Sequence, residues 1–170
     1  MNRYLIPKYL ANSIYEIDFN KIKELGYENV FVDLDNTLAS PYDYLPEQKT
    51  IDLINRIKSY SLNVTIISNN HEERVNKFAT PLNIKYLFEV KKPQTKKLKK
   101  YLIENNIDFN RSIIIGDQVM TDVNIANHLN IDVILVKPLT SNDEPITFFP
   151  RLLDKHFRRI IYKRNLSKEF

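Results

Sequence analysis

Short apolar runs alternate with longer stretches of helical periodicity along this chain of 170 residues. Each run is short and apolar and is bounded by polar or turn residues, a pattern typical of strands that are buried on both faces. The predicted strands span residues 30–34, 64–67, 86–89, 112–115 and 132–136.

Helical periodicity fills the segments between these strands. The predicted helices span residues 46–60, 70 onward, 93 to about 105, and 121–129. Glu73 follows Asn70 at the spacing of a capping box, and Pro93 suits the first turn of the next helix. Strands and helices in regular alternation predict an α/β fold, a three-layer sandwich with helices on both faces of a central parallel sheet.

The composition excludes several kinds of active site. The chain has no cysteine, which rules out disulfides, thiolate zinc sites and cysteine nucleophiles and fits a reducing cytoplasm. Its two glycines, Gly26 and Gly116, are too few for a glycine-rich phosphate loop. No apolar run approaches the roughly 20 residues of a membrane span, and the first ten residues do not resemble a signal peptide. We therefore expect a cytoplasmic protein.

The positive charge is concentrated at one end of the chain. The net charge is +4, from 25 Lys and Arg against 21 Asp and Glu. Residues 148–170 hold seven of these basic and two of these acidic side chains, so the remainder has a net charge of −1. This distribution argues against a nucleic-acid-binding core and for a single basic surface element.

The most informative motif follows the first predicted strand, where residues 30–38 read Val-Phe-Val-Asp-Leu-Asp-Asn-Thr-Leu. Asp33 and Asp35 are two apart, so in an extended chain both point to one side, at the strand end where open α/β sheets bind ligands. Such a pair needs a cation or a shared proton, and Mg²⁺ prefers oxygen ligands. One carboxylate can attack phosphorus while the other donates a proton and later activates water. Solvated loop residues or helix caps are the alternative, which the strand before the pair and Asn36-Thr37-Leu38 after it disfavour.

Two further strand ends offer groups that suit a phosphate. Ser68 follows the strand at 64–67, where its hydroxyl and the free N–H groups of a helix start can bind phosphate oxygens, with Asn70 as a possible N-cap. Lys92, held extended before Pro93, can neutralise a phosphoryl group. A solvated basic helix face is the competing explanation, because residues 91–100 contain six lysines.

The fourth strand end reads Gly116-Asp-Gln-Val-Met-Thr-Asp122, with one of the two glycines between a strand and an acidic loop. Asp117 is placed to bind a metal, and Asp122 can be a second ligand, bind through water, or cap the next helix. The histidines are scattered and suit the surface: His71, His128 and His156. Carboxylates, a hydroxyl and an ammonium at four strand ends suit metal-assisted phosphoryl transfer.

These four motifs, in this order, resemble those of the haloacid dehalogenase-like (HAD) superfamily of phosphatases. The matching pieces lie within residues 28–137 and are Asp33-Leu-Asp-Asn-Thr, Ser68-Asn-Asn, Lys92-Pro and the Gly116 to Asp122 segment. The resemblance implies a Rossmann-like domain in which Asp33 is the nucleophile, Asp35 the acid and base, and Lys92 the group that steadies the phosphoryl oxygens.

The resemblance also implies a cofactor and a set of ligands. Mg²⁺ would be bound by Asp33, by the main-chain carbonyl of Asp35 and by Asp117, with Asp122 as a further candidate. The implied substrate-binding residues are Thr37, Ser68, Asn69 and Lys92.

The nearer resemblance is to the subclass IIIA branch called the YqeG family, which shares the Asp-Leu-Asp-Asn-Thr-Leu and Gly-Asp-Gln-x-x-Thr-Asp-Val strings and a basic C-terminal end. That branch is similar to the mitochondrial phosphatidylglycerophosphatase, which removes phosphate from a lipid precursor of phosphatidylglycerol and cardiolipin. This chain departs from the branch at residues 124–127, Asn-Ile-Ala-Asn, where members carry two glycines. The difference predicts altered helix packing near the site but leaves the catalytic positions intact.

No large cap domain fits into this chain. Only residues 39–46 and 71–91 lie where such phosphatases insert a substrate-selecting cap, and strand and helix use most of the second segment. We expect a single domain over residues 1–170 with an open site, suited to a phosphate monoester on a larger body such as a lipid headgroup or a protein.

The C-terminal segment predicts a basic amphipathic helix at about residues 148–164. Its apolar face comprises Phe149, Leu152, Leu153, Phe157, Ile160 and Ile161, and its basic side chains are Arg151, Lys155, Arg158, Arg159, Lys163 and Arg164. This face can pack on the sheet, or it can lie on an anionic membrane. The N-terminal residues Tyr4, Leu5, Ile6, Tyr9 and Leu10 are a second candidate for a membrane contact.

The sequence thus predicts a Mg²⁺-dependent phosphatase that forms an aspartyl-phosphate and acts on phosphatidylglycerophosphate, with a peripheral contact at the inner membrane face. A first alternative is a phosphatase of soluble metabolites, such as nucleotides or sugar phosphates. A second, of another class, is a non-catalytic module that binds a nucleic acid or protein through its basic helix. Intact Asp33, Asp35, Lys92 and Asp117 argue against the second alternative, and we expect no nucleic-acid partner.

Overall fold

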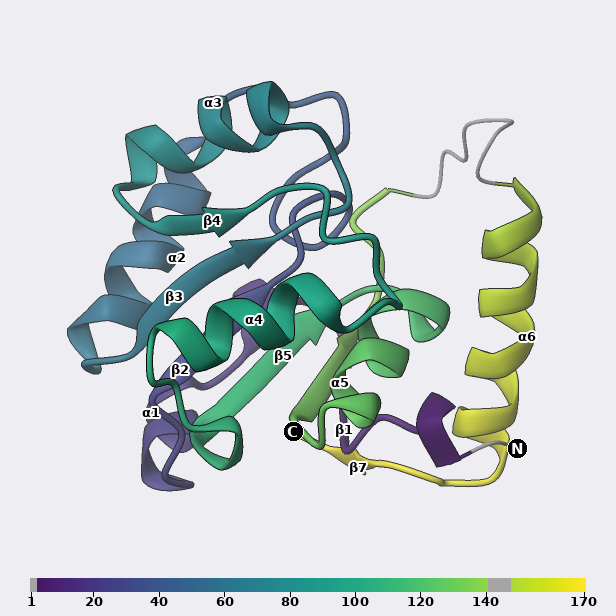
Figure 1. Ribbon diagram of the computed structural model, residues 1–170. Helices are drawn as coiled ribbons and strands as arrows, with labels where there is room; N and C mark the ends of the chain where they lie inside the picture. The colour runs from purple at the N-terminus through teal and green to yellow at the C-terminus, as the bar shows by residue number, and fades with distance from the viewer. Residues whose placement is uncertain (1–2, 141–147) are drawn as a thin grey trace.

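The strands form one parallel sheet, as the alternating pattern predicted. In the computed structural model, which describes residues 3–140 and 148–170, the strands are β1 (Tyr9–Ala11), β2 (Asn29–Val32), β3 (Asn63–Ile67), β4 (Lys85–Leu87), β5 (Ser112–Gly116), β6 (Asp132–Val136) and β7 (Lys168–Glu169). Among these residues their order is β4-β3-β2-β5-β6-β1-β7, with every pair parallel (Figure 1).

Helices cover both faces of this sheet and complete a three-layer sandwich (Figure 1). One face packs against α1 (Phe19–Glu24), α2 (Gln48–Ser59) and α3 (Glu72–Leu82), and the other against α4 (Lys96–Glu104), α5 (Asn124–His128) and α6 (Phe148–Lys163). Side chains of β2 alternate between the two cores, because Val30 and Val32 enter the first and Phe31 enters the second. The fold is therefore the predicted HAD-like α/β sandwich, without a cap domain in the described residues.

The strand register brings distant parts of the chain to one edge. Val32 of β2 is the partner of Ile66 in β3 and of Ile115 in β5. The residues that follow these strands therefore emerge side by side at the carboxyl edge of the sheet. Asp33, Ser68 and Asp117 belong to those segments.

Two predicted helix starts are wrong by a few residues. Helix α3 begins at Glu72 rather than Asn70, because the Asn70 amide is used elsewhere: its Nδ2 donates to Asp35 at 3.2 Å and its Oδ1 accepts the His71 N–H at 2.8 Å. Helix α4 begins at Lys96, and Pro93 precedes it in a turn. Neither the capping box nor the first-turn proline is present.

The helix predicted at 121–129 is divided. Residues Val119–Val123 form a π-helical turn, η4, in which the Val123 N–H donates to the Gln118 carbonyl at 3.2 Å, and α5 follows it. A π-turn is wider than an α-turn and occurs often at functional sites. Here it carries Asp122, whose Oδ2 accepts the Gln118 N–H at 3.0 Å.

The N-terminal segment belongs to the core, so its predicted role as a membrane contact is wrong. β1 pairs with β6, and Leu5 and Leu10 are both buried. The Nδ2 of Asn127 donates to the carbonyls of Tyr4 and Ile6 at 3.0 Å each. Asn127 thus anchors the N-terminal segment to helix α5.

Helix α6 packs on the core through part of its predicted apolar face, whereas Leu153 on that face is 37% exposed. Ile161 is fully buried, and Phe157 packs partly buried against the same cluster. Arg159, Lys163 and Arg164 are exposed. The side chains of Phe149, Arg151 and Leu152 lie outside the described set. Within residues 3–140 and 148–170, no helix combines the length and apolarity required to cross a bilayer.

This packing yields a test of stability. Replacing Ile161 by Ala is expected to lower the free energy of unfolding by about 2–5 kcal/mol, because the lost side chain leaves a cavity. Leu153→Ala, on the same helix but 37% exposed, is the matched control and should change it by less than about 0.5 kcal/mol. Urea unfolding followed by circular dichroism measures both. Equal, small effects would show that α6 is not part of the cooperative core.

Candidate active site

Most of the predicted site residues line one cavity at the carboxyl edge of the sheet. This cavity has a volume of about 530 Å³. Its lining is Asp33, Asp35, Ser68, Asn69, Asn70, His71, Lys92, Gln118, Thr121 and Asp122. Two other predicted residues, Thr37 and Asp117, lie buried beside it and contact the site through Asp33 and Asp122.

Lys92 lies between two carboxylates in the wall of this cavity. Its Nζ is 2.5 Å from Asp33 Oδ1 and 2.6 Å from Asp122 Oδ1, and it also donates to the Ile67 carbonyl at 3.0 Å. Burial acts to lower the pKa of the Lys92 ammonium, but the charges of Asp122 and Asp33 outweigh burial and raise the pKa above its ordinary value. Lys92 is therefore a fixed positive charge beside Asp33.

Asn69 holds the backbone of Lys92. The Lys92 N–H donates to Asn69 Oδ1 at 2.7 Å, and Asn69 Nδ2 donates to the Lys92 carbonyl at 3.1 Å. Among the six lysines of residues 91–100, Lys92 is the buried one. The solvated-face explanation therefore holds for its neighbours but not for Lys92.

Three carboxylates form a buried group that suits a metal ion. Oxygens of Asp33, Asp117 and Asp122 lie within 4.8 Å of one another. Burial raises the pKa of Asp33 to about 7, with Lys92 opposing the shift and Asp122 adding to it. Burial likewise raises the pKa of Asp117 well above its ordinary range, and Asp33 and Asp122 add to the effect.

The donor set of this group fits a hard divalent cation. Asp117 Oδ1 is buried without a hydrogen-bond partner among the described residues, and the described ion pairs of Lys92 are with Asp33 and Asp122. A buried acceptor without a partner is costly unless an ion or water meets it. Mg²⁺ and similar ions prefer such oxygens.

Gly116 makes the close approach of Asp122 possible. A Cβ atom at position 116 would lie 2.3 Å from the Cγ of Asp122. Any other residue would push this carboxylate away from Asp33 and Lys92. Glycine is thus required at position 116 because any side chain would collide with Asp122, and not because of its backbone conformation.

Asp35 points to a different pair of partners. Its Oδ1 accepts from Arg74 Nη2 at 3.0 Å and its Oδ2 accepts from Asn70 Nδ2 at 3.2 Å. Its carboxylate is not a member of the group of three. The structure therefore separates the two carboxylates of the first motif into distinct environments.

Arg74, on α3, is a site residue that sequence reasoning missed. Its side chain is 7% exposed and its guanidinium lies between the rings of Tyr44 and Phe78, 5.6 and 5.4 Å from their centroids. Its Nε and Nη1 are buried without partners in the described residues. In the sequence, Glu72-Glu73-Arg74 reads as a solvated helix start, so no signal marks it.

Two hydroxyls lie below the carboxylates. The Thr37 hydroxyl, fully buried, donates to Asp33 Oδ2 at 3.4 Å. Ser68 Oγ accepts the Asn70 N–H at 3.0 Å and lines the cavity. Thr37 thus contacts Asp33 directly, and Ser68 is part of the cavity wall.

Helix α6 is clamped to the loop that carries Asp117. Asp154 Oδ1 accepts the Val119 N–H at 2.5 Å, and Arg158 donates to the carbonyls of Asp117 and Val136. The two side chains also pair, with 2.7 Å between Arg158 Nε and Asp154 Oδ2. Arg158, one of the basic side chains that the sequence predicts on this helix, thus binds carbonyls at two strand ends.

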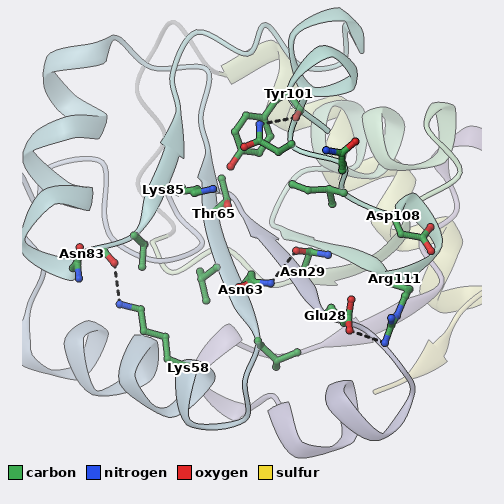
Figure 2. A pocket seen from close by; sticks show the side chains of 16 residues that line it. Glu28, Asn29, Lys58, Asn63, Thr65, Asn83, Lys85, Tyr101, Asp108 and Arg111 are labelled. Atoms are coloured by element: carbon green, nitrogen blue, oxygen red, sulfur yellow. Dashed lines mark hydrogen bonds and ion pairs between the residues drawn. The ribbon is translucent and has the colours of Figure 1, made fainter. Parts of the chain in front are cut away.

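A second cavity, of about 670 Å³, lies at the opposite edge, where the strands begin (Figure 2). Several of its charged groups are used within the wall, as Figure 2 shows: Arg111 Nη2 lies 2.7 Å from Glu28 Oε1, and Lys58 Nζ donates to the Asn83 carbonyl. Among the described residues, no cluster of metal-ligating side chains lies in this second cavity. The larger cavity is therefore not the candidate active site. The grouped carboxylates and Lys92 identify the smaller cavity at the carboxyl edge as that site.

Comparisons with known proteins agree with this geometry. Residues 1–140 match the family model described as mitochondrial PGP phosphatase. The chain is 31% identical over 155 residues to the probable phosphatase YqeG of Bacillus subtilis (strain 168), across 91% of this chain and 90% of that protein.

Two further matches are more distant. Phosphatidylglycerophosphate phosphatase 1, chloroplastic/mitochondrial, of Arabidopsis thaliana is 24% identical over 155 residues, across 84% of this chain and 44% of that protein. A crystal structure of an uncharacterized protein from Listeria monocytogenes serotype 4b superposes with a TM-score of 0.54 at 15% identity, across 78% of this chain and 99% of that chain. At that identity the likeness shows the fold alone.

The raised pKa of Asp33 predicts how stability depends on pH when no divalent cation is present. The folded state favours neutral Asp33, so this contribution is complete below about pH 4 and is lost as pH rises through about 7. The difference in free energy of unfolding between wild type and Asp33→Asn should therefore shift in favour of the variant across this interval. Urea unfolding in a chelator, at several pH values, measures it. A difference independent of pH would contradict the prediction.

Proposed function

The chain belongs to the mitochondrial PGP phosphatase family and is a phosphatase, and on this premise we propose that it hydrolyses phosphatidylglycerophosphate with Asp33 as nucleophile and Mg²⁺ as cofactor. The observation that carries the proposal is the position of Asp33. It is buried at a sheet edge, held by Lys92 and grouped with two further carboxylates at an open cavity.

The first step is an attack by an Asp33 carboxylate oxygen on phosphorus. A bond forms between this oxygen and phosphorus as the bond from phosphorus to the leaving alcohol oxygen breaks. In the acid and base role that the family resemblance gives it, Asp35 donates a proton to that leaving oxygen. Lys92 stays charged throughout and offsets the negative charge of the phosphoryl oxygens.

The second step returns the enzyme to its starting state. Asp35, now a carboxylate, takes a proton from a water that attacks the phosphorus of the aspartyl-phosphate. The bond between phosphorus and the Asp33 oxygen breaks, and inorganic phosphate leaves. Ser68 and Asn69, at the next strand end, line the cavity on the side where the phosphate would lie.

The cofactor would be held by the group of three carboxylates, Asp33, Asp117 and Asp122. When bound, Mg²⁺ would supply positive charge against these carboxylates and the phosphoryl oxygens. The partnerless Oδ1 of Asp117 supports this assignment. The family resemblance adds the main-chain carbonyl of Asp35 as a further ligand.

The open site supports a substrate carried on a membrane rather than a small soluble ester. The described residues contain no cap that would enclose a metabolite, and α6 presents exposed Arg159, Lys163 and Arg164. The name of the Arabidopsis thaliana relative points to the same lipid. We therefore place the protein in the cytoplasm, in peripheral contact with the inner membrane face.

The proposal predicts Mg²⁺-dependent phosphate release from phosphatidylglycerophosphate in mixed micelles. Asp33→Asn should lower this rate by about 10³-fold or more, because the amide cannot form the covalent intermediate. Soluble phosphate monoesters are assayed in parallel with the lipid. Release from soluble esters without release from the lipid would overturn the substrate assignment, and equal rates for wild type and variant would overturn the role of Asp33.

Arg74 should act as a positioning residue for Asp35. Arg74→Met is expected to lower kcat by about 10- to 100-fold with little change in KM, because Asp35 loses a partner that orients it. Arg74→Lys should restore part of the rate, since it keeps the charge but loses the planar fork. Arg56→Met, an exposed arginine on α2, is the matched control. A fall in KM and kcat together, or none in either, would contradict this role.

A further inference from the structure

The loop of residues 40–46, which follows the catalytic motif, exposes three large apolar side chains close together. Tyr42 is 57% exposed, Tyr44 63% and Leu45 62%. Single exposed apolar residues are ordinary on protein surfaces. The described residues contain eight such large side chains, so three within four consecutive positions are a cluster.

The loop holds these side chains outward by its own hydrogen bonds. Ser40 Oγ accepts the Tyr42 N–H at 3.3 Å, and the Asp43 carboxylate accepts the Ser40 N–H at 3.1 Å. Arg74 Nη2 donates to the Ser40 carbonyl at 3.3 Å. Pro41 and Pro46 further restrict the backbone. The exposed side chains are therefore carried by an ordered turn, whose backbone would lose little conformational entropy on binding.

The loop borders the active site. Arg74 links the two, because its guanidinium carbon is 5.6 Å from the Tyr44 ring while its Nη2 is 3.0 Å from Asp35. A fourth apolar side chain, Leu139, is 37% exposed and lies nearby, since its N–H donates to the Asn36 carbonyl at 2.9 Å. The loop and Leu139 are thus each connected to the first motif, the loop through Arg74 and Leu139 through Asn36.

We propose that Tyr42, Tyr44, Leu45 and Leu139 form a docking surface for an anionic phospholipid bilayer and seat the open site on it. The inference rests on the proposed function insofar as the substrate is a lipid. Tyrosine suits the boundary between headgroups and acyl chains, because its ring is apolar and its hydroxyl can stay hydrated.

Charge complementarity favours a membrane over a protein partner. The carboxylate of Asp43 is turned back to its own loop, and Glu47 pairs with Lys49 at 2.8 Å, so the acidic groups of the loop are engaged. Helix α6 passes the same sheet edge, where Arg158 contacts the Asp117 and Val136 carbonyls. Lys155 and Arg159, which are exposed and adjacent in sequence to Asp154 and Arg158, bring the basic side chains that attachment to an anionic surface requires to this end of α6.

The test is binding of the full chain to vesicles of phosphatidylglycerol mixed with phosphatidylcholine, measured by co-sedimentation. The double variant Tyr42→Ser/Leu45→Ser should bind at least about tenfold more weakly. Tyr44 is left in place because its ring contacts Arg74. Turnover of a soluble phosphate monoester should be unchanged, which shows that the site is intact.

A matched control replaces two other exposed apolar side chains. Leu25 is 49% exposed and Ile103 59% exposed, and both lie at helix ends near the amino edge of the sheet. Leu25→Ser/Ile103→Ser should bind vesicles as the wild type does. An equal loss in both variants would overturn the proposal, because general hydrophobicity would then explain the binding.

The remaining outcomes separate this inference from the proposed function. Vesicle binding that depends on the loop, without hydrolysis of phosphatidylglycerophosphate, would support the docking surface and overturn the substrate. Hydrolysis of the lipid with equal vesicle binding by wild type and loop variant would support the substrate and overturn the docking surface. A concentration-dependent dimer that the loop variant abolishes would assign the surface to a second copy of the chain and overturn the proposal.

Discussion

The compensation of buried charge at one sheet edge is the constraint on which the rest of the structure depends. Asp33, Asp117 and Asp122 are buried together, and Lys92 supplies one positive charge among them. Burying carboxylates is costly unless charges and hydrogen bonds offset the loss of water. A group with this excess of negative charge is suited to bind a cation. The same cation would offset the cost of burying the carboxylates and supply charge for phosphoryl transfer.

The surrounding elements serve to hold that group. The register of β2 with β3 and β5 aligns the strand ends, and the π-turn η4 with Gly116 brings Asp122 close. Helix α6 then clamps the same loop through Asp154 and Arg158. The C-terminal basic helix is therefore both a surface element and a support of the site, and its inward polar residues matter as much as its apolar face.

The two carboxylates of the first motif have been given different surroundings. Asp33 faces Lys92 and the acidic group, whereas Asp35 faces Arg74 and Asn70. Two carboxyl groups can act as a nucleophile and as an acid and base only if their surroundings give them different proton affinities. Arg74 also contacts the ring of Tyr44 and the Ser40 carbonyl, so Asp35, helix α3 and the loop of residues 40–46 form one continuous set of contacts.

The sequence by itself determined the α/β class, the five strands β2 to β6 and the strand ends that carry Asp33, Ser68, Lys92 and Asp117. It could do so because hydrophobic periodicity is local and parallel strands place their carboxyl ends at one edge. β7 was missed because a run of two residues carries no period, and β1 was missed because Tyr9 and Leu10 were interpreted as part of a membrane contact. Only the tertiary structure decided the roles of Arg74, Asp154 and Arg158, the start of α3 and the burial of Lys92. These depend on contacts between segments far apart in the chain, which leave no local pattern for the sequence to show.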